Sequence, residues 1–348
     1  MEIYCSSSFI DKCETLADLL KRNKKYNNNN IIFILDTNLC VYFRDFYNSP
    51  LKFKIKYKEI YETIKKLHGM LYLYKDNVIC ALAIEESSRT LNDFSLNIDK
   101  QRNTKFAVQY LLQMNPYQFN QFAFTVKSSS SVKDKNQRAN SKINALKQET
   151  PFMEYLRVIY ACMLKLYLIK RKDIDNITKY KEYLDFIDIE INLTLSQINV
   201  FSGFYIFDDY SSIKKIMDKE GKSLAEILHN IWNASIDMYF ITFARMFIRP
   251  NEIPVLVTSD KHLYKLDSMM KYHRISFDNN GDVIPEGHEM ELLDNLDFLK
   301  MDERDAFLKL TDDFNKRRKA KGETRDPYDN SILNICEQLE NELNILIE

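Results

Sequence analysis

Three short apolar segments, each followed by an acidic residue, are the clearest feature of the hydrophobic pattern along this chain. Such a run, bounded by polar turn-forming residues, is typical of a buried parallel strand. The carboxyl ends of parallel strands meet at one edge of a sheet, so the acids that follow them should converge there. The segments and acids are residues 31–35 with Asp36, residues 78–84 with Glu85, and residues 253–257 with Thr258, Ser259 and Asp260.

The rest of the pattern predicts mostly helices. Only 6 Gly and 7 Pro in 348 residues favour long helices over an all-β design. Shorter apolar segments at residues 70–74, 204–209 and 274–277 are expected as strands. The expected helices cover residues 9–22, 51–67, 89–126, 152–171, 176–198, 223–247 and 261–270, and the chain from residue 288 onward.

Composition narrows the class of protein without indicating an activity. Hydrophobic residues make up 45% and charged residues 28% of the chain, a balance typical of globular proteins. Because the formal net charge is −1, a polyanion must be held by local basic patches or through a metal ion. The 6 cysteines have no zinc-site spacing, and no signal peptide or membrane-spanning run is visible, so we expect a cytoplasmic protein that does not enter a membrane.

Two segments are rich in basic residues. One is the polar loop predicted at residues 127–150, with Lys133, Lys135 and Arg138; the other is residues 315–326, with Arg317 and Arg318. Most such segments are solvated surface, and that alternative applies here. In a protein that acts on nucleic acid, they become candidates for holding phosphates.

A fourth acid, Asp237, lies on the amphipathic helix predicted just before the third apolar segment. Four carboxylates in one cleft repel one another unless a cation binds or some become protonated. Carboxylate oxygens are the hard ligands that Mg²⁺ and Mn²⁺ prefer. Such an ion would polarise a phosphodiester and lower the pKa of an attacking water.

Each acid also has a less specific interpretation. Asp36 could cap the turn after its strand, and Asp260 could cap a helix that begins at Lys261. Glu86 is adjacent to Glu85 and could take its place, and Asp237 could be a charged surface residue.

The ordered set of motifs resembles the PIN-domain nucleases. Asp36-Thr37-Asn38 after a strand resembles their first motif, Glu85 their second acid, Asn233 to Asp237 their third motif, and Val257 to Asp260 their fourth. The resemblance implies a three-layer α/β/α fold with a parallel sheet of strand order 3-2-1-4-5. It also implies Mg²⁺- or Mn²⁺-dependent cleavage of RNA or single-stranded DNA. In that family Thr37, Asn38 and Ser259 would order the ligands by hydrogen bonds, and Asn233 would have a supporting position.

The resemblance covers roughly residues 31–90 and 223–280, about a third of the chain, and predicts four segments. Residues 1–90 and 223–280 would form the PIN-like domain, residues 91–222 a large helical insertion containing the basic loop, and residues 281–348 a helical extension. The insertion and extension would select substrate, bind a regulatory protein partner or restrain activity; a homodimer is compatible with this organisation.

Three functions follow as hypotheses. The first is a metal-dependent nuclease, of the kind used as toxin-like or defence effectors. The second is a catalytically silent PIN-like module that binds RNA or serves as a scaffold; the retained acids argue against it. The third is a doubly wound domain for a small nucleotide, which the absence of any GxGxxG or GxxxxGK[ST] run disfavours.

Overall fold

The computed structural model describes residues 2–7, 31–90, 95–126, 141–147, 151–193, 196–207, 216–217, 223–243, 252–268, 270–277, 283–292, 299–321 and 331–347. The chain divides into two compact units, and each unit is discontinuous in sequence. Unit 1 comprises residues 1–136 and 244–289, and unit 2 comprises residues 137–243 and 290–348.

Unit 1 contains a small mixed sheet of four strands in the order β1-β4-β2-β3. Its central strand β2 runs parallel to both β3 and β4, and the short β1 pairs antiparallel with β4 at the edge. In the parallel part, β2 of the first predicted segment therefore lies between β3 of the second and β4 of the third. Among the described residues there is no five-stranded parallel sheet of order 3-2-1-4-5. The strands are β1 (Tyr4–Ser6), β2 (Ile31–Leu35), β3 (Val78–Ile79) and β4 (Ile253–Thr258).

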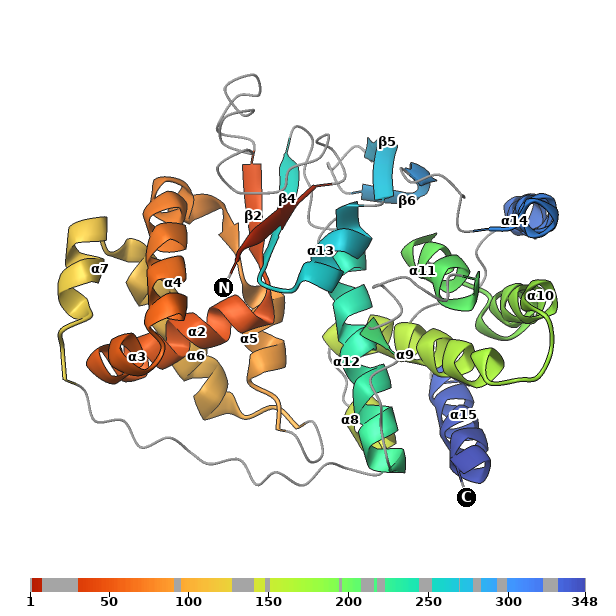
Figure 1. The fold of residues 1–348 in the computed structure, drawn as a ribbon, viewed down its shortest axis with the longest axis horizontal. Coiled ribbons are helices and arrows are strands. Elements are labelled where there is room, and N and C mark those ends of the chain that lie inside the picture. Colours follow the sequence, from red (N-terminus) through yellow and green to blue (C-terminus); the bar gives the residue numbers. More distant parts are fainter. Residues whose placement is uncertain are drawn as a thin grey trace. The chain divides into compact units, whose positions relative to one another are not determined.

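Helices surround this sheet on two sides, with α13 on one side, against β1 and β4, and α2, α4 and α6 on the other (Figure 1). Local sequence signals set several helix starts: the Asn115 side chain and Gln118 form a reciprocal capping box at α7, with Pro116 in the first turn. The helices of unit 1 are α2 (Thr37–Asn48), α3 (Pro50–Lys56), α4 (Lys58–Leu71), the 3₁₀ segment η2 (Tyr72–Asn77), α5 (Ala81–Ser87), α6 (Ile98–Gln113), α7 (Pro116–Phe122) and α13 (Lys261–Ser268).

The core of unit 1 forms around β2 and α2. The side chains of Phe33 and Leu35 are buried in the sheet, and Leu39, Cys40 and Phe43 follow on α2 at helical spacing. Helix α2 packs against α5 and α6, which fixes where it begins at the end of β2. A separate two-stranded sheet pairs β5 (Met270–Phe277) with β6 (Val283–Leu292).

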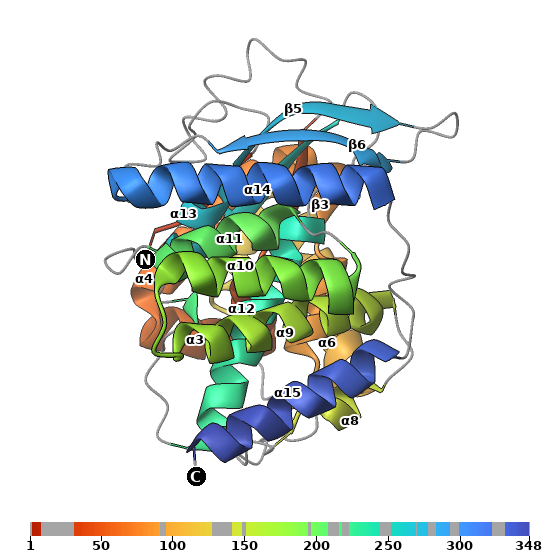
Figure 2. The same cartoon turned by 90° about the vertical axis from the view of Figure 1, so that its right-hand side faces the viewer.

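Unit 2 is helical. Its central helix α9 is buried along most of its length and packs against α10, α11, α12 and α15. Figure 2 shows α14, α10 and α9 running side by side, with α12 crossing them steeply. The helices are α8 (Ile143–Leu146), α9 (Pro151–Lys170), α10 (Asn176–Phe186) with the π-helical turn η3 (Ile187–Ile191), α11 (Ser196–Phe207), α12 (Leu224–Phe243), α14 (Met301–Lys321) and α15 (Ser331–Ile347).

Several predicted elements differ from the observed ones. Residues 70–74 end α4 and begin η2, residues 204–207 end α11, and only Val78–Ile79 of the segment 78–84 is a strand, since α5 begins at Ala81. A short apolar run does not by itself distinguish a strand from a buried helical turn, and tertiary packing decided these three. The predicted helix at residues 9–22 lies outside the described residues, as does most of the basic loop at 127–150.

The two units also differ from the four predicted segments, and the segment predicted as helical from residue 281 begins with strand β6 (Val283–Leu292). Helices α6 and α7, predicted to open the insertion, belong to unit 1, and α12, predicted as part of the PIN-like domain, belongs to unit 2. In the part of the chain that the structure describes, no helix combines the length and the apolar character needed to cross a membrane.

Candidate active site

Asp36 lies where β2 meets α2. Its amide donates a hydrogen bond to the carbonyl of Val257 at 3.0 Å, which ties this junction to the neighbouring parallel strand β4. Its side chain accepts a hydrogen bond at Oδ2 from Thr258 Oγ1 at 2.8 Å, and the residue is only 5% exposed. The acid that follows the first apolar segment is therefore a buried, oriented carboxylate at the carboxyl edge of the sheet.

The end of β4 contributes Thr258 and Asp260. Thr258 Oγ1 donates to Asp36 and accepts from the amide of Asp260 at 2.9 Å. Asp260 Oδ1 in turn accepts from the amides of His262 and Leu263, at 2.7 and 3.1 Å. Asp260 thus caps α13, as its alternative interpretation predicted, and its charge also acts on Asp36.

The third carboxylate of this site belongs to Glu86, the neighbour of the predicted Glu85. Thr37 Oγ1, in the first turn of α2, donates a hydrogen bond to Glu86 Oε2. The side chain of Glu85 is instead ion-paired at 2.5 Å with Arg89 Nη2, one helical turn further along α5. The sequence prediction placed the acid directly after an extended apolar segment. Because α5 begins at Ala81, helical geometry brings the next residue, Glu86, to Thr37.

Burial makes two of these carboxylates hard to ionise. Burial, with a further contribution from the charge of Asp260, raises the pKa of Asp36 from 3.8 to about 6, although hydrogen bonds from Thr258 and two backbone amides oppose the rise. Burial, together with the charge of Asp36, raises the pKa of Glu86 from 4.5 to about 8, against the hydrogen bond from Thr37. No Lys, Arg or His among the described residues is ion-paired with either acid.

These groups suit a hard divalent cation in donor chemistry. The site offers carboxylate oxygens from Asp36, Glu86 and Asp260 without a compensating cation, and Mg²⁺ is often held by only one or two carboxylates with water completing its shell. Within the described ranges, no group of three or more His, Cys, Asp or Glu side chains is arranged to hold a metal ion. The geometry therefore provides a two-carboxylate site with a third charge nearby, and not a closed cage.

The other predicted site residues have different surroundings. Asn38 is exposed on the first turn of α2, and Ser259 is half-buried between Thr258 and Asp260. Thr258, which the sequence prediction did not choose, holds Asp36, because the parallel register pairs Leu35 with Val257 and so brings the next residues, Asp36 and Thr258, together. Aligning the two apolar runs as parallel neighbours was the signal that could have identified it.

Asp237 and Asn233 lie on α12, which belongs to unit 2. Both are half-buried, and Asn233 Nδ2 lies 3.3 Å from Nε2 of His229 on the same helix. The hydrogen bonds of Asp36, Glu86 and Asp260 described above are all made within unit 1.

The predicted phosphate-binding residues of α14 are engaged within unit 2. Arg317 and Arg318 are both ion-paired with Asp188, and Arg318 also donates to Asn192 Oδ1 at 2.7 Å and to its carbonyl at 3.1 Å. Arg318 is only 7% exposed, so it stabilises the turn at η3 and is not presented to a ligand. Lys133, Lys135 and Arg138 lie outside the described residues.

Comparisons with known proteins leave the class open, since no family model, curated protein or solved structure matches the chain. The resemblance to PIN-domain nucleases therefore stays a prediction from four short motifs.

Proposed function

We propose that unit 1 is a PIN-like, metal-dependent nuclease that hydrolyses phosphodiester bonds in RNA or single-stranded DNA. The observation that supports this most directly is the acid cluster: the buried Asp36 and the half-buried Glu86 lie at the carboxyl edge of the parallel strands, with raised pKa values and without an ion-pair partner among the described residues. Keeping two such carboxylates is costly for stability, which is typical of groups retained for binding or catalysis.

In this proposal Asp36 and Glu86 bind the cation, and Thr258 and Thr37 hold their carboxylates in place. Asp260, whose Oδ1 is committed to capping α13, contributes negative charge beside Asp36. A bound Mg²⁺ or Mn²⁺ would supply the acidified water and neutralise charge on the phosphate. Because the pKa of Glu86 is about 8 in the absence of a cation, metal binding near neutral pH would displace a proton from this side chain, so metal affinity should increase with pH.

A cleavage assay tests the proposal. Purified protein is incubated with end-labelled single-stranded RNA and with DNA of the same sequence, in Mn²⁺, Mg²⁺ or EDTA. We expect metal-dependent cleavage by the native protein and its loss in Asp36→Asn and Glu86→Gln. Glu85→Gln is the matched control, because it makes the same chemical change one residue away, at a side chain that faces Arg89.

The outcomes separate the assignments. If Glu85→Gln abolishes cleavage and Glu86→Gln does not, the second acid is Glu85 and the site described above is misassigned. If Asp36→Asn still cuts, the active site lies elsewhere.

A catalytically silent RNA-binding or scaffolding module is the second candidate. The observation in its favour is that the described residues form no three-ligand metal group. It predicts that the native protein and all three variants bind RNA equally and that none cleaves it in any metal.

A further inference from the structure

We propose that unit 1 binds single-stranded nucleic acid on a face built from stacked aromatic rings and exposed lysines, which we call the strand-binding face. This inference deepens the proposed function, because it assigns a substrate-binding surface to the unit that carries the acid cluster. The face is formed by Tyr47, Lys52, Lys56, Phe106, Tyr110 and Phe124.

Exposed aromatic side chains are confined to one part of the described chain. Five aromatic residues are exposed there, Tyr57, Phe106, Tyr110, Tyr117 and Phe124, and all five belong to unit 1 between residues 57 and 124. The other large aromatic side chains whose exposure is described are buried or half-buried. Two of these exposed rings, Phe106 and Tyr110, are in contact, and adjoining exposed apolar side chains mark interaction sites more often than single ones do.

The rings are held in a fixed arrangement. Phe106 and Tyr110, one turn apart on α6, have ring centroids 5.6 Å apart with planes 15° from parallel. Tyr47 at the end of α2 contacts both rings edge-on, at 5.6 and 5.5 Å, and stacks on Phe122 at 5.9 Å. Because the outer rings Phe106 and Tyr110 are 54% and 43% exposed, their outward surfaces can stack on nucleic-acid bases.

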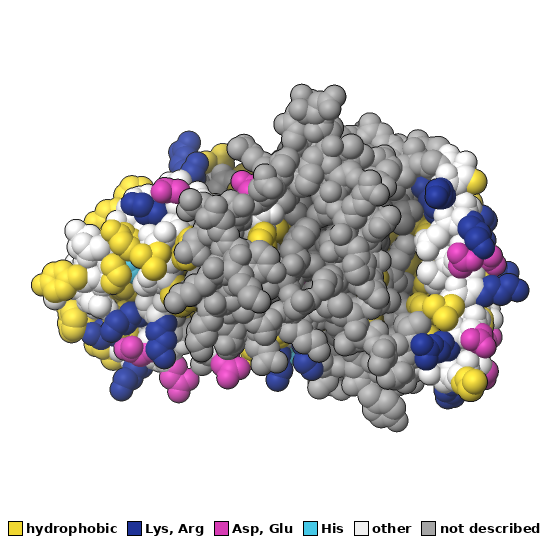
Figure 3. All heavy atoms as spheres, turned by 90° about the horizontal axis from the view of Figure 1, so that it is seen from above, with side chains coloured by type: hydrophobic (Ala, Val, Ile, Leu, Met, Phe, Trp, Pro, Cys, Tyr) yellow, Lys and Arg dark blue, Asp and Glu magenta, His cyan; other side chains and the backbone are white. Residues whose placement is uncertain are grey.

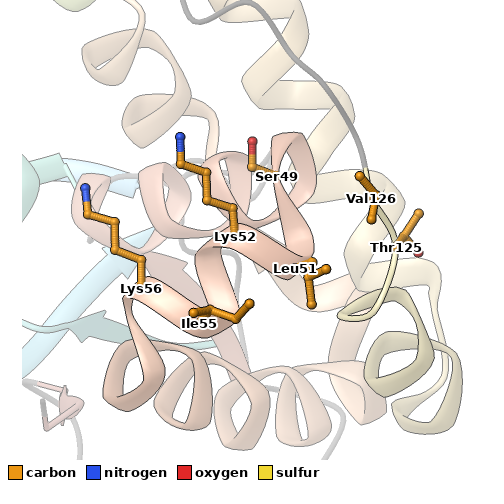
Figure 4. A pocket seen from close by; sticks show the side chains of 7 residues that line it. All are labelled: Ser49, Leu51, Lys52, Ile55, Lys56, Thr125 and Val126. Carbon is orange, nitrogen blue, oxygen red and sulfur yellow. The ribbon is translucent and has the colours of Figure 1, made fainter.

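A pocket of about 420 Å³ adjoins the rings and carries the lysines. Figure 4 shows Lys52 and Lys56, one turn apart on α3, extending their amino groups to the same side, while Leu51 and Ile55 project to the other. Nearby, Lys54 Nζ lies 3.5 Å from the centroid of the Phe124 ring. The pocket is lined by Ser49, Leu51, Lys52, Ile55, Lys56, Thr125 and Val126.

The pocket lies on the two chain segments that carry Tyr47 and Phe122, the rings against which Phe106 and Tyr110 of α6 pack. Tyr47 precedes Ser49 of the pocket by two residues, and Phe122 precedes Thr125 by three, while the amide of Leu51 bonds the carbonyl of Thr125 at 3.4 Å. In the view of Figure 3, the part of unit 1 that carries α4 and α7 shows hydrophobic side chains beside Lys and Arg, with some Asp and Glu among them.

Charge determines the class of ligand. Lys52 and Lys56 are exposed, and neither has an ion-pair partner among the described residues. An anionic ligand with flat, hydrophobic groups fits both halves of the face, and a single-stranded polynucleotide has both phosphates and unstacked bases. A duplex has the phosphates but hides its base faces.

The strand-binding face is linked to the acid cluster by α2. Asp36 immediately precedes this helix and Tyr47 is near its last residue, so at 1.5 Å per residue the two are separated by about 16 Å along the helix axis. One bound strand of a few nucleotides can therefore extend from the aromatic rings toward the carboxylates.

Fluorescence anisotropy with labelled single-stranded oligouridylate tests the inference, in EDTA so that binding is measured without cleavage. Phe106→Ala/Tyr110→Ala should weaken binding at least about fivefold. This is the change in affinity expected when one base loses its stacking on an aromatic side chain, taken at the weaker end of the known range. Lys52→Gln/Lys56→Gln should lower the slope of log K against log salt by about 1.4, since each lost phosphate contact removes about 0.7 for single strands.

Matched controls come from unit 2. Ile189→Ala removes an apolar side chain that is 75% exposed, and Lys181→Gln/Lys309→Gln removes two exposed lysines outside the basic segment 315–326; both should leave affinity and salt slope unchanged. All of the substituted side chains are exposed, and far-ultraviolet circular dichroism confirms that each variant is folded.

The inference is overturned if both unit 1 variants bind as the native protein does, if the duplex form of the probe binds equally well, or if polyglutamate binds the face in place of the oligonucleotide. Cleavage assays on the same variants keep it distinct from the proposed function. If binding depends on this face but the native protein cleaves nothing, only the proposed nuclease function is refuted. If the native protein cleaves and the substitutions on this face leave binding unchanged, only this inference is refuted.

Discussion

Replacing Glu86 with glutamine should stabilise the protein at neutral pH, although it removes a residue that we assign to the active site. In the folded protein the pKa of Glu86 is raised from 4.5 to about 8, so the folded state holds this proton more tightly than the unfolded chain does. Protonated Glu86 makes its full contribution to the stability of the folded state below pH 4.5. This contribution is lost as the pH rises toward 8. Glutamine is neutral throughout and accepts the same hydrogen bond from Thr37.

The size of the effect follows from the two pKa values. Each unit of difference between pH and the unfolded pKa costs about 1.36 kcal/mol until the folded pKa is reached. At pH 7 the native protein is therefore destabilised by about 3 kcal/mol, and at pH 5 by less than about 1 kcal/mol. Because Glu86 is half-buried, these values are upper limits, and Glu86→Gln should recover most of them.

Urea unfolding followed by circular dichroism, at pH 5 and pH 7 in EDTA, measures the difference. Glu85→Gln is the control and should act in the opposite direction, since it removes the carboxylate partner of the fully buried Arg89 side chain and costs about 1–3 kcal/mol. Added Mn²⁺ should stabilise the native protein more than Glu86→Gln, because a ligand that binds only the folded state stabilises it. The reasoning would be refuted if Glu86→Gln raised the free energy of unfolding equally at both pH values, or lowered it at pH 7.

Three further changes test other parts of the structure. Asp36→Asn should raise the free energy of unfolding by up to about 3 kcal/mol above pH 6 and have little effect at pH 4, because folding raises the pKa of Asp36 from 3.8 to about 6; urea unfolding at the two pH values checks this. Asp260→Ala should cost about 1 kcal/mol by removing the cap of α13, whereas Asp260→Asn keeps most of that stability, as thermal melts will show. Arg318→Lys should cost about 1–3 kcal/mol in urea unfolding, because lysine cannot reproduce both hydrogen bonds to Asn192, while oligouridylate affinity stays unchanged.

Local pattern was sufficient for the two strands that precede Asp36 and Asp260. The apolar runs at β2 and β4 predicted both strands, and Asp36 and Asp260 follow them as expected. Apolar spacing also predicted helices over α3–α4 and α9, with ends within a few residues. These features depend on the spacing of hydrophobic residues within one segment, which can be read directly from the sequence.

The tertiary structure alone decided which side chains meet. Glu86 and not Glu85 reaches Thr37, because α5 begins at Ala81. Adjacent side chains on a helix point in different directions, so Glu86 contacts Thr37 while Glu85 contacts Arg89. The arginine predicted to hold phosphate, Arg318, is instead paired with Asp188, more than a hundred residues earlier in the chain. A sequence pattern determines the period of an element and therefore its type. The partner of each side chain depends on contacts between distant segments, which no local pattern encodes.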